Sequence, residues 1–197
     1  MSTLKVNTLD TVTGTTIATA SGKTIKMPDM CVQMKVKFVS QKQLIDSAST
    51  TGVDTCIASD AFTPKFADSK IFVSIHPMIG SSNLNGGLGI KRTTGGVDTF
   101  ISKNATGSYS TGAGQLPNAY FSSDESPLEV NQNGQYAVGG VYNLFGFDLH
   151  GTAPASIVYT MTFHSNASNE YLHINQPKSN TSQGFGQSCI ILQEFAQ

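Results

Sequence analysis

Apolar and polar side chains alternate in two stretches of this chain. In residues 32–38 every even position is apolar, whereas the odd positions hold glutamine or lysine. Successive side chains of a strand point to opposite faces, so this pattern predicts a strand with one apolar and one solvated face. We expect the apolar face to cover a core. Residues 157–164 repeat the pattern and place four large side chains on one face: Ile157, Tyr159, Met161 and Phe163.

Further strands are predicted at intervals of roughly ten residues, separated by turns rich in glycine, proline and asparagine. Thr94-Gly95-Gly96 lies between two of them and indicates a hairpin, because glycine adopts positive φ without a steric penalty. Only residues 41–48 suit a helical turn. The other predicted strands are residues 66–77, 88–92, 97–101, 136–149, 171–175 and 188–196. About eight to ten such strands are typical of an antiparallel β-sandwich or barrel.

Residues 1–28 have a different composition. Small and hydroxylated residues dominate, and single apolar residues interrupt them at Leu4, Val6, Leu9, Val12, Ile17 and Ile25. Such a segment has too few large side chains for a core of its own, so we expect it to pack against copies of itself or a larger assembly. Pro28 marks its end. The chain therefore divides into a short extended N-terminal stem, residues 1–28, and an all-β knob, residues 29–197.

Composition narrows the class of protein. Of the 197 residues, 39% are apolar and only 13% are charged, with a net charge of −1. No cluster of Lys and Arg exceeds two residues, so no nucleic-acid partner is expected. No apolar run approaches the ~20 residues of a membrane span, and no signal peptide is visible, so we expect no membrane insertion. A neutral, polar β protein of this kind is typical of extracellular or virion proteins.

Three cysteines are present: Cys31, Cys56 and Cys189. An odd number without CxxC spacing argues against a zinc site or a disulfide framework. Free buried thiols are the expected state. One disulfide and one free thiol are the alternative.

Candidate chemistry is sparse. If residues 157–164 and 171–175 form a hairpin, His164 and His173 come close enough for a metal pair, but no third ligand accompanies them. We therefore expect them to be polar residues on an outer strand face. Asp124, Glu125 and Glu129 suit a glycosidase carboxylate pair, yet neighbouring serines and Pro127 favour a solvated turn. The sequence thus predicts no catalytic residue, no metal and no cofactor, and no enzyme activity.

Three aromatic residues flank a loop rich in Ser, Gly and Asn over residues 103–125: Tyr109, Tyr120 and Phe121. Rigid rings among small polar residues make a recognition surface at low entropic cost, and ring faces stack on sugars. They are the candidate receptor-contact residues. The alternative is that the rings fix the loop to the knob or to a neighbouring subunit.

Several short phrases resemble small structural proteins of tailed phages that infect marine bacteria. They are residues 2–7, residues 20–28, Thr63-Pro64-Lys65-Phe66 with residues 69–73, and residues 191–196. The resemblance implies a trimeric, jelly-roll-like knob that joins other virion proteins through the stem.

The resemblance further implies a non-enzymatic tail-fibre or fibre-tip component of the virion that touches host-surface glycans. A capsid decoration or head-fibre protein is the alternative. A polysaccharide-cleaving enzyme is a third reading that the missing carboxylate pair disfavours. We expect synthesis in the host cytoplasm and release by lysis.

Overall fold

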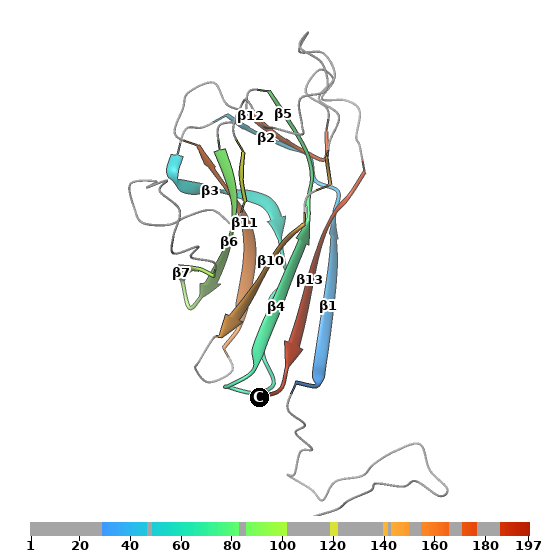
Figure 1. The fold of residues 1–197 in the computed structure, drawn as a ribbon, viewed down its shortest axis with the longest axis vertical. Helices are drawn as coiled ribbons and strands as arrows, with labels where there is room; N and C mark the ends of the chain where they lie inside the picture. Colours follow the sequence, from blue (N-terminus) through green and yellow to red (C-terminus); the bar gives the residue numbers. More distant parts are fainter. Residues whose placement is uncertain are drawn as a thin grey trace, which may run out of the picture.

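The structure is a computed structural model that describes residues 29–46, 49–82, 86–101, 119–121, 140–141, 143–149, 155–165, 171–176 and 186–197. Within these residues the chain forms thirteen strands in three antiparallel sheets and no helix (Figure 1). This confirms the predicted all-β sandwich. The stem predicted for residues 1–28 lies outside the described part.

The first sheet holds four strands in the order β1-β13-β4-β10. They are β1 (Cys31–Val39), β13 (Ser188–Phe195), β4 (Lys70–His76) and β10 (Leu144–Leu149). The second sheet runs β3-β11-β6-β7, and β8 also pairs with β6. Its strands are β3 (Ser49–Ala58), β11 (Ile157–Ser165), β6 (Gly86–Thr94), β7 (Val97–Phe100) and β8 (Ala119–Phe121).

A smaller third sheet, in the order β2-β12-β5-β9, closes the end of the sandwich opposite the C-terminus (Figure 1). Its strands are β2 (Gln43–Asp46), β12 (Tyr171–Ile174), β5 (Met78–Ser82) and β9 (Gly140–Val141). These short strands, together with β8, explain why the number of strands exceeds the expected eight to ten.

The pairing of the main strands is nested. β1 pairs with β13, β3 with β11, β4 with β10, and β6 with β8, all antiparallel. The first main strand thus meets the last, the second meets the next to last, and so on inward. A long hairpin wrapped in this way into two facing sheets is a jelly roll.

One hydrophobic cluster fills the sandwich and draws side chains from both large sheets. β11 contributes the face that its alternation predicted, with Tyr159, Met161 and Phe163 fully buried. From the first sheet, β4 contributes Ile71, Val73 and Ile75, and β13 contributes Ile190 and Leu192. Each of these sets follows the two-residue period of a strand.

The predicted orientation of β1 is wrong. Its apolar side chains Met34, Val36 and Phe38 point away from the core and are exposed, whereas the lysines lie on the inner side. Lys35 Nζ stands 5.9 Å from the centre of the Phe62 ring and donates a hydrogen bond to the Ala61 carbonyl at 2.8 Å. The reason is that β1 is an edge strand, where long lysine side chains cover the margin of the core and still reach water.

Other local predictions had mixed outcomes. The hairpin is confirmed, because Gly95 and Gly96 join β6 to β7 with φ values of 56° and 80°. The helical turn at residues 41–48 is wrong, since residues 43–46 pair with β12 as a strand. Residues 136–149 do not form one strand. Their described parts split into β9 and β10, which belong to different sheets.

Candidate functional site

The outward face of the first sheet is the most unusual surface of the described chain. Residues directly opposite one another in an antiparallel ladder share a face, so the register defines rows across the four strands. One row consists of Val36, Ile191, Ser74 and Phe145, and the next consists of Met34, Gln193, Phe72 and Phe147. Both rows point away from the core. This outward face is therefore built from strands near both ends of the chain.

Two apolar clusters occupy the two edges of the outward face. The β1 cluster is Met34, Val36 and Phe38, and the β10 cluster is Phe145, Phe147 and Leu149. The exposed fractions of these six residues run from 45% for Val36 to 66% for Leu149. Taking ~200 Å² for a fully exposed large side chain, the six together expose roughly 700 Å².

Phe72 of β4 extends the β10 cluster toward the middle of the sheet. Its ring centre lies 5.0 Å from that of Phe147 and 6.4 Å from that of Phe145, both in tilted arrangements. Such geometry is favourable for aromatic pairs because ring edges then approach ring faces. The three rings form one aromatic platform that reaches from the β10 edge toward the middle of the face.

Few ionisable groups lie on the outward face. In the rows that the register defines, they are the Cys31 thiol and Lys70, in the row of Leu149, and His76 and the Cys189 thiol, in the row of Phe38. The imidazole of His76 hydrogen-bonds with the Asn143 side-chain oxygen through Nδ1 at 2.6 Å and with the Ser74 hydroxyl through Nε2 at 3.0 Å. The outward face is consequently close to neutral and mostly apolar.

Cys189, His76 and Asn143 have the residue types of a Cys-His-Asn catalytic set. Cys189 lies directly opposite His76 in the β13–β4 register. However, burial raises the pKa of the Cys189 thiol above its ordinary value. A nucleophilic cysteine needs a lowered pKa, so this environment keeps the thiol protonated at neutral pH and works against catalysis. This grouping was not predictable from the sequence, because its members lie far apart along the chain.

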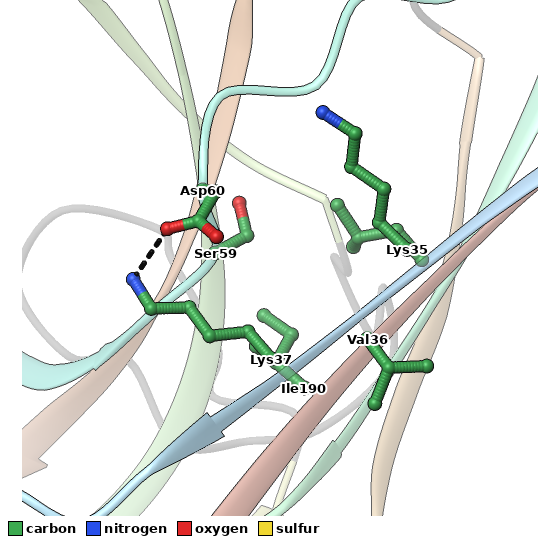
Figure 2. Close-up of a pocket in the computed structure, with 7 residues that line it drawn as sticks. Lys35, Val36, Lys37, Ser59, Asp60 and Ile190 are labelled. Atoms are coloured by element: carbon green, nitrogen blue, oxygen red, sulfur yellow. Dashed lines mark ion pairs between the residues drawn. The ribbon is translucent and has the colours of Figure 1, made fainter.

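A pocket of about 160 Å³ lies at the β1 edge of the sandwich (Figure 2). Its lining includes Lys35 and Lys37 from β1 and Ser59 and Asp60 after β3. Lys37 Nζ forms an ion pair with the Asp60 carboxylate at 2.9 Å. Pockets for organic ligands usually span ~300–1,000 Å³, so this one suits a few water molecules.

The two candidate histidines are not brought together in a hairpin. His164 lies on β11 in the second sheet, whereas His173 lies on β12 in the third. Both are buried, so the expectation of an outer strand face is also wrong. His164 Nε2 hydrogen-bonds with the Thr162 hydroxyl at 2.9 Å, and its ring packs edge-on against Phe100. In the described part of the chain, no group of three potential metal ligands occurs.

The aromatic candidates are only partly covered by the structure. Tyr109 lies outside the described residues, as does the acidic cluster at residues 124–129. Tyr120 and Phe121 belong to β8, where their backbones pair with Gly87 and Gly86 of β6. The three cysteines are free, as expected, but Cys31 is exposed and the other two are only partly buried.

Comparisons with known proteins identify no family for this chain. No protein-family model and no curated protein matches the chain. Among solved structures, the crystal structure of the infectious bursal disease virus VP2 subviral particle is similar over 91% of this chain, with 9% identity and a TM-score of 0.38. The chain spans 42% of that protein's length. In the part of the chain that the structure describes, no helix is long and apolar enough to cross a membrane.

Proposed function

We propose that this chain is a non-enzymatic structural subunit of a phage virion. It acts as a homotrimeric tail-fibre or fibre-tip protein whose jelly-roll knob contacts the host surface. The low charge of the chain, the small-residue stem and the phrases shared with phage structural proteins support this proposal. Jelly rolls serve both as viral structural domains and as lectins, so the fold suits a particle protein that recognises glycans.

The observation that carries the proposal is that the two ends of the sandwich differ in what they hold. The Asp29 N–H donates to the Ala196 carbonyl at 2.7 Å, and the Ala196 N–H donates to the Met30 carbonyl at 3.0 Å. Residues 1–28 therefore join the sandwich beside the last strand, at one end of its long axis. The third sheet and the paired part of β8 lie toward the opposite end (Figure 1). An appendage held through residues 1–28 presents that opposite end to its surroundings.

This arrangement suits recognition of a host surface through many weak contacts, each made by the free end of one copy. Loops on a β-scaffold carry recognition well because the strands fix their ends. Of the segment at residues 103–125, the structure describes residues 119–121, which form β8 and pair with the first residues of β6. Weak glycan contacts of this kind become strong when several copies engage one cell surface at once.

Cryo-electron microscopy of purified phage particles, with mass spectrometry of the same preparation, tests the proposal. We expect the chain among the particle proteins, with trimeric density on the tail and the stem directed toward the particle. Density on the shell would favour capsid decoration instead of a fibre role. Absence of the chain from purified particles would refute a virion function.

A further inference from the structure

The outward face of the first sheet exposes an unusually large apolar area, divided between the clusters at its two edges. Together the clusters expose roughly 700 Å², and the largest single apolar patch on a typical monomer is ~300–600 Å². Six of the nine large apolar residues that are exposed in the described chain lie on this one face. We propose that other copies of this chain dock on the outward face and together bury both clusters.

The size of the face fits such a partner. A stable protein interface buries ~800 Å² on each side, and the six side chains alone supply most of that area. Phe72 and Ile191 lie between the clusters, one in each row, and extend the apolar surface from both edges toward the middle of the sheet. Apolar sheet faces pack against other sheets, as the inner faces of sandwiches do.

The chemistry of the face favours a protein partner over a glycan. Sugars need many hydrogen-bonding groups, and the two central rows offer only Ser74 and Gln193. The near-neutral face and the net charge of −1 mean that two copies approach without strong like-charge repulsion. A second copy is also always present at the concentration of the chain itself.

On the two edge strands of the sheet, inward-facing polar side chains already have partners within the chain. The outward-facing apolar side chains are therefore the ones left to meet another copy. On β1 the inward-facing Lys37 pairs with Asp60. On β10 the inward-facing Asp148 accepts a hydrogen bond from Arg92 at 2.8 Å. Only the outward side of each edge strand remains apolar and uncovered by described residues. Only the number of copies that assemble rests on the proposed function. That copies dock on this face is argued from the face itself.

Light scattering and native mass spectrometry of the full-length chain test the inference. The variants Phe38→Lys and Phe147→Lys place a charge in the β1 cluster and in the β10 cluster. Both side chains are largely exposed, so the fold of each copy is expected to survive, which circular dichroism checks. Val97→Lys is the matched control, because Val97 is equally exposed on β7 of the other large sheet.

We expect the wild-type protein to have a multiple of the 20.9 kDa chain mass at micromolar concentration. Each cluster variant should raise the dissociation constant at least tenfold, and the control should leave it unchanged. A wild-type monomer across this range would overturn the inference, as would equal dissociation of the Val97→Lys control. A monomer in which Lys23 or Lys26 cross-links to Lys70 within one chain would show that residues 1–28 cover the face instead.

These outcomes are separate from those of the virion test. A chain that self-associates through the outward face but is absent from particles would retain this inference and refute the proposed function. A chain that is found in particles but stays monomeric in solution, with unaltered behaviour in both cluster variants, would refute this inference and retain the virion role.

Discussion

The carboxylate of Glu194 accepts a hydrogen bond from the Ser69 hydroxyl at 2.6 Å, which links the last strand to the loop before β4. The same carboxylate also accepts the backbone N–H groups of Lys65 and Phe66 at 2.8 Å and 3.0 Å. Gln33 of β1 adds a fourth donor at 2.6 Å. Glu194 is fully buried, so this one side chain fixes three segments that are remote in sequence.

Replacing Glu194 with alanine should lower the free energy of unfolding by about 3 kcal/mol or more. The loss follows because several donors around a buried charge would lose their acceptor, at ~1–3 kcal/mol for each unsatisfied group. Urea denaturation measures it. Asp60→Ala is the control, since that carboxylate is exposed and its ion pair with Lys37 is worth ~0–1 kcal/mol. Equal effects of the two substitutions would contradict the role assigned to Glu194.

The contrast between β11 and β1 shows how far the alternation of side chains predicts a fold. β11 is a central strand, paired with β3 and β6, and its apolar face is buried in the core. β1 lies at a sheet edge and alternates just as cleanly, yet its apolar face points outward. Alternation therefore establishes that two faces differ. It does not establish which face meets the core.

A second prediction concerns the buried Tyr159 hydroxyl, which donates to the Asp148 carboxylate at 2.8 Å. Burial, together with the nearby Asp148 charge, raises the pKa of Tyr159 far above its ordinary value of 10.0. The folded state thus keeps a proton that the unfolded state releases above pH ~10. Stability is complete below that pH and should then fall by about 1.4 kcal/mol per pH unit.

Urea denaturation between pH 8 and pH 11 checks this dependence. Tyr159→Phe should remove the part of the slope that belongs to this group. It should also lower stability by about 1–3 kcal/mol at pH 8, because Asp148 loses a buried donor. An unchanged slope in the variant would mean that another group causes the alkaline loss.

Gly52 and His164 provide a third prediction. A Cβ atom added at Gly52 would lie 2.6 Å from His164 Cε1, and His164 is held between Thr162 and Phe100. Gly52→Ala should therefore lower stability by about 1–3 kcal/mol beyond the effect of its positive φ. Gly96→Ala isolates the backbone effect, since Gly96 has φ of 80° and open space around its Cβ position. Thermal unfolding compares them, and equal losses would contradict a steric origin.

The outward face was not predictable from the sequence for a specific reason. Its rows combine β1 and β13, from opposite ends of the described chain, with β4 and β10. In β10 the residue between Phe145 and Phe147 is Gly146, so the local pattern does not show which side of the strand is buried. Only the nested pairing of strands reveals that these aromatic side chains lie in the same rows as Val36 and Met34.

Host contact through the aromatic segment is the fourth prediction. Tyr109→Ala or Tyr120→Ala should reduce adsorption of particles to host cells by roughly tenfold or more, because each lost contact is multiplied over the copies. The melting temperature should change little. Val97→Ala on the neighbouring β7 is the control. Unchanged adsorption with a loss of ~3–5 kcal/mol in stability would instead identify these rings as core residues.

The last prediction tests how copies meet on the outward face. In a trimer with threefold symmetry each contact is heterologous, so two different surfaces must meet. The β1 cluster of one copy would then pack against the β10 cluster of the next. Phe38→Lys and Phe147→Glu should each weaken assembly when introduced alone. The double variant should recover much of it, because opposite charges then meet at every contact between copies.

Sedimentation velocity at two salt concentrations checks this recovery. At 1 M salt the screening length falls to ~3 Å, so assembly of the double variant should weaken while that of the wild type does not. The like-charged double variant, Phe38→Lys with Phe147→Lys, is the matched control and should remain dissociated at low salt. If both double variants were equally dissociated, the β1 cluster of one copy would not pack against the β10 cluster of another, which would contradict the threefold arrangement described above.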